Sequence, residues 1–168
     1  MSDNLYDTDF VRWTERQADA LRRAAGEGSN LPVDWDNLAE EVESLGRSER
    51  REVRSLVRTI VAHLLKLAYS PSVETRVGWE SEISHHRTLL QEALKDSPSL
   101  RPSLGEVVAE ETPRAVRLAA QSLRKYREYE AATAVASLEP TMTADQVLDD
   151  DWFVPGTRFE RAPVGEGG

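Results

Sequence analysis

The sequence has 168 residues, of which 39% are hydrophobic and 30% charged, and this suits a single soluble domain with a core of its own. Its formal net charge of -9 disfavours binding to DNA or to an anionic membrane, and the absence of cysteine excludes disulfides, thiol catalysis and thiolate zinc sites. No apolar run approaches the roughly 18 residues of a membrane span, and the opening residues lack the pattern of a signal peptide, so we expect a cytoplasmic protein.

The first predicted helix begins at Asp7, a suitable N-cap, and ends at Gly26 and Gly28. Its apolar residues recur every three or four positions, which is the spacing of one helix face. They are Tyr6, Phe10, Trp13, Leu21 and Ala24, with Gln17 in the same series. A connecting loop with the sequence SNLPV follows.

The longest predicted helical segment runs from Trp35 to Tyr69, with Asp34 as its N-cap. An apolar stripe marks its first half, and a broader one marks its second half. Gly46 lies between the two. Because glycine lowers helix stability by about 1 kcal/mol relative to alanine and often ends a helix, we predict a break or kink there. The first stripe consists of Trp35, Leu38, Val42 and Leu45.

Three further helices are predicted after this segment. One covers residues 74–95, with Trp79, Ile83, His86, Leu90 and Leu94 on one stripe. The next covers about residues 98–131, with Ser97 as its cap; its apolar stripe stays in phase across Pro113, which favours one kinked helix over two. Thr143 and Gln146 form the capping box of a short last helix.

These elements predict an all-α fold, an antiparallel helical bundle of four to five main helices with a short C-terminal helix. Residues 1–155 form its single domain, and the Gly- and Pro-rich residues 156–168 form a disordered C-terminal tail. The four tryptophans lie on or beside apolar stripes, so we expect them in the core. Some can instead mark a self-association surface, because helical bundles with surplus apolar face commonly pair two-fold.

Five arginines share the face of the central segment that lies opposite its apolar stripe. Such a face can bind nucleic acid, or it can be a solvated surface whose charges are offset by Glu43, Glu49 and Glu52. The acidic character of the whole chain favours the solvated surface, because a nucleic-acid footprint is normally basic. The arginines are Arg47, Arg50, Arg51, Arg54 and Arg58.

Two histidines, His63 and His86, lie on or beside the apolar stripes of neighbouring predicted helices. If those faces meet, the imidazoles approach each other, and Glu111 has the helical phase of a third ligand in a metal site with two histidines and a carboxylate. Partial burial with hydrogen bonds is the commoner state of histidine, so we predict no metal ligands here. The single Glu-x-x-His, from Glu82 to His85, excludes a di-iron bundle, which needs two.

The paired carboxylates do not indicate acid–base catalysis. Glu40 and Glu41 are adjacent, so on a helix they point about 100° apart. The run from Asp149 to Asp151 lacks the alternating ligands and the glycine of a calcium loop. There is also no phosphate-binding glycine loop after a strand and no serine-centred elbow, so we predict neither catalytic nor cofactor-binding residues and no cofactor.

The string DWDNLAEEVESLGRSERRE, which begins at Asp34, resembles the signature segment of a bacterial family known as domain of unknown function 29. Three other pieces match in the family's order: YDTDFVRWTERQADALR, DSPSLRPSL and TADQVLDDDWFVP. The resemblance covers nearly all of residues 5–155 and implies an all-helical fold. It implies no activity, because the family has no established reaction, cofactor or catalytic residue.

The first functional hypothesis is therefore a cytoplasmic interaction or scaffold protein without enzymatic activity, acting as a homo-oligomer or on another protein. A metal-binding bundle or metal-dependent enzyme that uses His63 and His86 is the first alternative. Nucleic-acid binding through the five arginines is the second. The sequence does not identify the ligand, the partner, the oligomeric state or the biological process.

Overall fold

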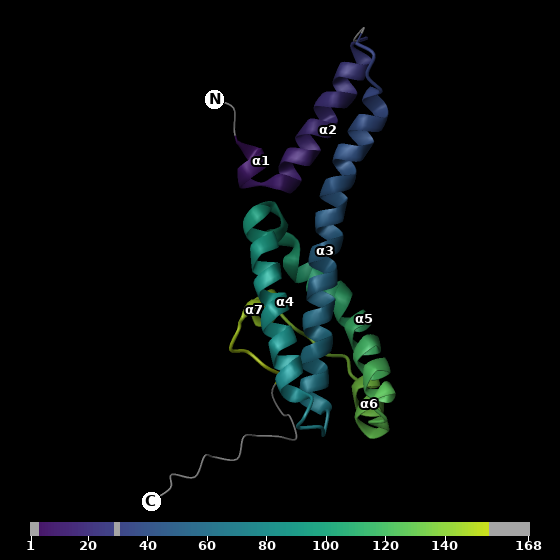
Figure 1. The fold of residues 1–168 in the computed structure, drawn as a ribbon, viewed down its shortest axis with the longest axis vertical. Coiled ribbons are helices and arrows are strands. Elements are labelled where there is room, and N and C mark those ends of the chain that lie inside the picture. Colours follow the sequence, from purple (N-terminus) through teal and green to yellow (C-terminus); the bar gives the residue numbers. More distant parts are fainter. Residues whose placement is uncertain (1–3, 29–30, 155–168) are drawn as a thin grey trace, which may run out of the picture.

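The chain is helical in the computed structural model, which describes residues 4–28 and 31–154 (Figure 1). There is no strand among these residues, and the predicted all-α fold is confirmed. None of the helices described is both long and apolar enough to cross a membrane. The predicted tail, residues 156–168, lies outside the described residues. The helices are α1 (Leu5–Thr8), α2 (Phe10–Gly26), α3 (Trp35–Tyr69), α4 (Arg76–Asp96), the 3-10 helix η1 (Pro98–Ser103), α5 (Leu104–Lys125), α6 (Tyr129–Ala136) and α7 (Ala144–Leu148).

The long helix α3 is the axis of the molecule (Figure 1). Helix α2 packs antiparallel along its first half, while α4 and α5 pack along its second half. We call α2 and residues 35–50 of α3 the arm. The rest of α3, together with α4 to α7, is the body. The arm extends beyond the body at one end of the molecule, and only its base, at the start of α2, packs against the body (Figure 1).

The hydrophobic core lies in the body, where the apolar stripes of α3, α4 and α5 meet as predicted. Each fully buried leucine or isoleucine there contributes about 1.5–3 kcal/mol by leaving water. Among the four tryptophans, only Trp79 is buried, whereas Trp13, Trp35 and Trp152 are half-buried. The core includes Val57, Ile60, Leu64, Ile83, Leu90, Leu94, Val108, Ala115 and Leu123.

The N-terminal helix differs from the prediction because Asp9, rather than Asp7, caps the long part. The Asp9 side chain accepts from the backbone N–H of Arg12 and from both the N–H and the hydroxyl of Ser99. This buried carboxylate therefore ends α1, starts α2 and ties the base of the arm to η1. The predicted caps at Asp34 and at Thr143, with the full capping box to Gln146, are confirmed.

The helix predicted over residues 98–131 is divided into three. Pro98 and Pro102 lie in the 3-10 helix η1, and α5 then runs through Pro113 without a break, as predicted. It ends at Lys125, where Arg127 has a left-handed backbone with φ of 62° and reverses the chain. The alanine-rich run beyond it forms α6.

The predicted break at Gly46 is wrong, because α3 continues through this residue. Gly46 is buried, and a Cβ added to it would collide with the hydroxyl oxygen of Thr14 on α2. That hydroxyl is itself held by a 2.7 Å hydrogen bond to the carbonyl of Val11. Gly46 is thus a point of close approach between the two helices of the arm, not a helix end.

We expect Gly46→Ala to lower the free energy of unfolding by about 1–3 kcal/mol, the usual effect of overpacking, despite alanine's higher helix propensity. Chemical denaturation followed by circular dichroism measures it. The matched control is Gly105→Ala in α5, where an added Cβ meets nothing within 4 Å and should raise stability. Adding Thr14→Ala to Gly46→Ala should recover most of the loss, because only the hydroxyl is too close; a loss that persists in the double variant contradicts this account.

Candidate functional site

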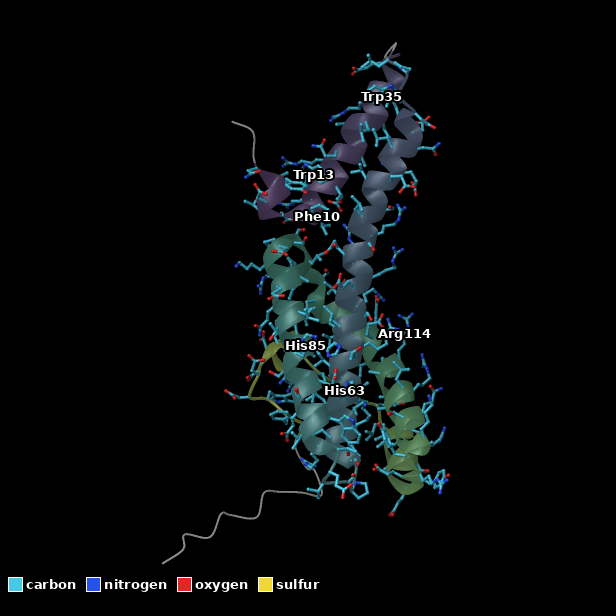
Figure 2. The ribbon with its side chains drawn as sticks, in the orientation of Figure 1. Phe10, Trp13, Trp35, His63, His85 and Arg114 are labelled. Atoms are coloured by element: carbon cyan, nitrogen blue, oxygen red, sulfur yellow. The ribbon has the colours of Figure 1, made fainter. Side chains whose placement is uncertain are left out.

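His63 on α3 and His86 on α4 approach each other in the body. Figure 2 shows the position of His63. Their ring centroids are 6.2 Å apart and their planes differ by 20°. Each Nδ1 lies against a backbone carbonyl one turn earlier, that of Thr59 at 2.9 Å for His63 and that of Glu82 at 2.7 Å for His86. In a neutral ring this places the proton on Nδ1 and leaves Nε2 as an acceptor.

The carboxylate considered as a third ligand, Glu111, is engaged elsewhere, by the arginines described next. In the described part of the chain, no group of three or more His, Asp or Glu side chains is placed to hold a metal ion. Burial lowers the pKa of His63, and the positive charge of Lys66 lowers it further, so this ring is neutral at pH 7. The geometry thus brings together two imidazoles, with the carboxylate of Glu82 beside them, its Oε2 3.5 Å from His86 Nδ1.

Glu111 is fully buried between α5 and α3 and faces three guanidinium groups. Its Oε1 accepts from Arg54 Nε at 3.0 Å and from Arg114 Nη1 at 2.6 Å. Arg58 Nε lies 2.9 Å from Oε2, but without the alignment of a hydrogen bond. Arg54 also reaches Glu110, with its Nη2 2.5 Å from Oε2. This cluster joins α5 to α3 and surrounds the carboxylate with three guanidinium groups, whose positive charge disfavours a metal ion there.

The arginine face of α3 is largely neutralised, as the solvated-surface interpretation predicts, but mostly by carboxylates other than the predicted ones. Arg47 pairs with Glu40 at 2.5 Å and with Glu43 at 3.5 Å, and Arg50 pairs with Glu15 of α2. Arg54 and Arg58 reach Glu110 and Glu111 of α5 as described. Glu43 is the one predicted partner that takes part in these pairs. The pairs weaken the argument for nucleic acid, because four of the five guanidinium groups already face carboxylates.

Arg87 on α4 is a residue that the sequence analysis did not single out. It is fully buried, and its guanidinium donates to four backbone carbonyls at 2.9–3.2 Å. These carbonyls belong to Gln146, Val147, Asp150 and Trp152, which form α7 and the turn after it. The positive charge is also close to the exposed Asp149–Asp151 run. Arg87 therefore fastens the C-terminal segment to the body.

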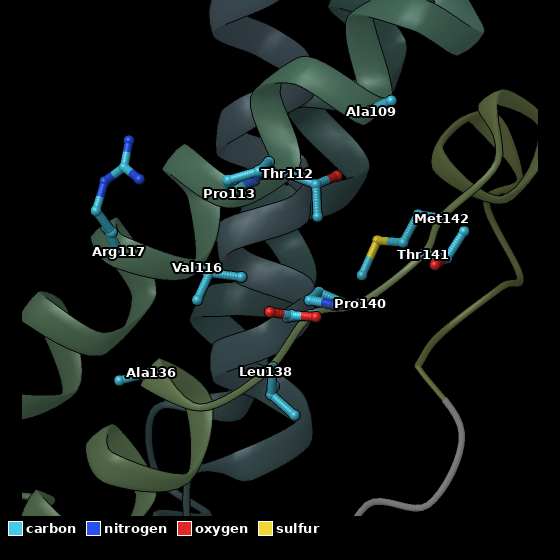
Figure 3. Close-up of a pocket in the computed structure, with 11 residues that line it drawn as sticks. Ala109, Thr112, Pro113, Val116, Arg117, Ala136, Leu138, Pro140, Thr141 and Met142 are labelled. Carbon is cyan, nitrogen blue, oxygen red and sulfur yellow. The ribbon is translucent and has the colours of Figure 1, made fainter.

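A cavity of about 590 Å³ lies between α5 and the chain that connects α6 to α7 (Figure 3). Its walls are mostly apolar, with Val116, Leu138 and Met142 among them. Arg117 and Glu139 are its only charged side chains among those described, and they have opposite signs. The cavity therefore lacks a convergent set of titratable groups that would point to catalysis.

The arm has one charged face and one apolar face. Ion pairs join its helices along the charged face, with Arg22 to Glu43 at 2.5 Å and Arg50 to Glu15. At 100° per residue, the opposite side of each helix carries apolar side chains, and in an antiparallel pair these two sides coincide. They are Phe10, Trp13, Leu21 and Ala24 of α2 and Trp35, Leu38, Val42 and Leu45 of α3.

This apolar face is the stripe that sequence analysis assigned to the interior. The structure packs α2 and α3 through small residues instead, including Ala18, Ala39 and Gly46, so the larger side chains remain at the edge. Leu38 is 42% exposed and Leu45 is 47% exposed. Trp35 lies near the tip of the arm and Trp13 near its base (Figure 2).

An aromatic cluster extends the apolar face at the base of the arm. The ring of Tyr6 meets those of Phe10 and Trp13 edge-on, at centroid distances of 5.9 and 4.9 Å. Phe10 and Trp13 stack at 5.7 Å. Tyr6 is 58% exposed, so the cluster packs mainly on itself. Partly exposed aromatic rings are therefore part of the apolar face at the base of the arm.

Comparison with known proteins agrees with the resemblance seen in the sequence. The profile of the family described as domain of unknown function DUF29 matches residues 5–153. The fold is similar to the crystal structure of an alpha-helical protein of unknown function from Rhodospirillum rubrum, with a TM-score of 0.71 and 30% sequence identity over 88% of this chain and 90% of the other. No curated protein matches the chain.

Proposed function

The chain belongs to the DUF29 family, and from this premise we propose that it is a non-enzymatic interaction module whose arm pairs with the arm of a second copy. The observation that carries the proposal is the apolar face of the arm. A two-helix hairpin buries only one side of each helix, so an ordered hairpin with Leu38 and Leu45 exposed has a surface that a partner can cover.

The spacing of this face suits helix pairing. Trp35, Leu38, Val42 and Leu45 follow each other at steps of three and four, which is the repeat of helices that pack side by side at a small angle. Two arms that meet through these faces form a four-helix bundle, the arrangement in which such a stripe is normally buried.

The charges at the edges of the face favour a second copy with its arm pointing the same way. Arg16 and Arg23 lie at the outer edge of α2, whereas Asp34 and Glu41 lie at the outer edge of α3. A two-fold axis along the arms places α2 of one copy over α3 of the other. Arms pointing opposite ways would instead place the α2 helices, and hence like charges, together.

These charges also lie at matching heights along the axis of the arm. Thr14 of α2 lies against Gly46 of α3, and the two helices run in opposite directions at about 1.5 Å per residue. Arg23, nine residues beyond Thr14, is therefore level with residue 37, nine residues before Gly46. In the two-fold pair it lies between Asp34 and Glu41 of the second copy.

The size of the face predicts a reversible dimer. An arm of 17 residues is about 25 Å long and about 20 Å wide, so pairing buries about 500 Å² on each copy. The total of about 1,000 Å² is at the low end of specific interfaces. We expect a dissociation constant in the micromolar range, measured by sedimentation equilibrium.

We expect Leu45→Glu to abolish the dimer, because it would bury two unpaired carboxylates in the centre of an apolar interface. Sedimentation equilibrium across a concentration series measures the mass. The matched control is Leu118→Glu in the body, since Leu118 has nearly the same exposure, 45%, but lies on α5. A wild-type protein that stays monomeric, or a Leu45→Glu variant that still dimerises, contradicts the proposal.

Charge reversal tests the orientation of the two copies. Arg23→Glu and Glu41→Arg should each weaken the dimer several-fold at low salt, and the double variant should restore it, because the pairs are exposed and individually weak. Restoration supports arms that point the same way. Additive weakening in the double variant contradicts that arrangement.

A further inference from the structure

A second cavity, of about 290 Å³, opens in the body between α3 and α5. Its polar lining comes from Thr59, His63 and Lys66 on α3 and from Gln121, Ser122 and Lys125 on α5. It contains two lysines and no carboxylate, in a chain with a net charge of -9. By contrast, the lining of the largest cavity described above includes Glu139. The electrostatic character of this cavity is therefore opposite to that of the protein as a whole.

Lys66 is the main reason to expect an anion there. Its side chain is only 8% exposed and its Nζ lies 5.0 Å from the centre of the Trp79 ring. Within the described residues, no carboxylate lies within ion-pair distance of this Nζ. Burial lowers the pKa of Lys66, with Glu82 opposing that shift at longer range. The carbon stem of Lys66 is buried, but its ammonium group is not enclosed, so it is open to the cavity and can pair there with an anion.

His63 adds a requirement on the chemistry of the anion. Its Nδ1 is occupied by the carbonyl of Thr59, so the neutral ring presents Nε2 as an acceptor. An acceptor repels a fully deprotonated oxyanion, but it accepts a hydrogen bond from an anion that keeps a hydroxyl. Inorganic phosphate keeps such a hydroxyl at pH 8, as hydrogen phosphate. Sulfate has none, and a phosphate monoester, whose second pKa is about 6, has lost its own by that pH.

We propose that this cavity binds a small phosphate-type oxyanion, with its charged oxygens towards Lys66 and Lys125 and its hydroxyl donating to Nε2 of His63. The proposal does not rest on pairing of the arms, because the cavity lies in the body. The ligand is inorganic phosphate in its hydrogen phosphate form, because a phosphate monoester lacks the hydroxyl at the pH of the test.

The test is a titration by isothermal calorimetry at pH 8, with inorganic phosphate, glycerol 3-phosphate and sulfate at matched ionic strength. Phosphate should bind about tenfold more tightly than sulfate. Bound sulfate has no hydroxyl, so it would leave Nε2 of His63 facing an oxygen lone pair. Glycerol 3-phosphate, whose phosphate group has no hydroxyl at pH 8, should bind more weakly than phosphate, and tighter binding of this ester contradicts the contact with Nε2. Absence of phosphate binding in the low-millimolar range, or equal binding of phosphate and sulfate, overturns the proposal.

Variants separate recognition from folding. Lys66→Met keeps the apolar stem against Trp79 and should remove phosphate binding, while Lys95→Met on α4 is outside the cavity and should not. Lys125→Met should weaken binding several-fold without risk to the fold, because Lys125 is exposed. His63→Phe should retain sulfate binding and remove the preference for phosphate. Unchanged affinity in both lysine variants contradicts the site.

The pH dependence gives an independent measurement. As the pH falls through the lowered pKa of His63, protonated Nε2 becomes a donor, so sulfate should bind more tightly and the preference for phosphate should shrink. The groups that face His63 are Lys66 on its own helix, Lys125 from α5, and His86 and Glu82 from α4. Bound phosphate should raise the pKa of His63 in an NMR titration, and no change in that pKa would count against the proposed contact.

Discussion

We expect Arg87→Met to release the C-terminal segment from the body. The substitution removes a buried cation and leaves four backbone carbonyls without their donors. Each hydrogen bond from a charged group contributes about 1.5–3 kcal/mol. Removing one partner of a buried, hydrogen-bonded charged pair costs about 3–5 kcal/mol in total, and we expect a loss of this size here. The segment can avoid part of this cost by leaving the body, which hydrates its carbonyls. The loss should therefore be seen first as local opening rather than as global unfolding.

Hydrogen exchange measures this opening directly. The amides of Val147, Asp149 and Trp152 bond within the segment, and in the variant their protection should fall by two to three orders of magnitude, about 3–4 kcal/mol. Protection of the α3 core amides around Ile60 should fall less. Arg101→Met is the control, since Arg101 is exposed and its loss should change stability by no more than about 0.5 kcal/mol. Unchanged exchange in Arg87→Met would show that the guanidinium does not hold the segment.

The helical architecture could be predicted from the sequence because the apolar spacing is regular wherever three helices meet. In α4, the apolar residues of the predicted stripe, Trp79, Ile83, Leu90 and Leu94, are all buried, while His86 is half-buried. Thr143 and Gln146 fixed the start of α7 because a capping box depends only on residues within one turn. Local chemistry and short-range periodicity were sufficient for these elements.

The errors arise where a contact between distant residues decides the local structure. Glycine at position 46 has a low helix propensity, but its lack of a Cβ lets Thr14 approach, and that contact is invisible in the local sequence. Asp9 outcompetes Asp7 as a cap because Ser99, ninety residues away, donates two hydrogen bonds to it. The small residues Ala18, Ala39 and Gly46 were the available signal, since helices that pack through small residues leave larger neighbours at the edge.

The candidate sites show the same limit. His63 and His86 could be placed on facing stripes from periodicity, and their rings do stack. Which carboxylate faces which cation could not be predicted, because a long side chain such as Arg54 or Arg58 can reach several turns of two helices. Glu111 has the phase of a histidine partner, yet it turns to the arginines of α3. Likewise, Arg87 looks like any surface arginine until the chain after α7 wraps around it.

We expect Glu111→Gln to lower the free energy of unfolding by about 1.5–3 kcal/mol, because it removes a buried carboxylate that accepts hydrogen bonds from charged groups, while the three arginines, 32–50% exposed, are hydrated in its place. Arg54, Arg58 and Arg114 then repel one another at the junction of α3 and α5. Chemical denaturation measures the loss, and added salt should recover part of it by supplying anions to the cluster.

Glu110→Gln is the matched control for this prediction. Glu110 is the adjacent residue and pairs with the same Arg54, but its side chain is 58% exposed, so its removal should cost less than about 1 kcal/mol. The contrast between two neighbouring glutamates isolates burial as the cause, because the type of residue, the helix and one arginine partner are the same. Equal losses in the two variants would mean that the cluster around Glu111 acts as an ordinary surface ion pair, and that α5 is held on α3 by apolar packing alone.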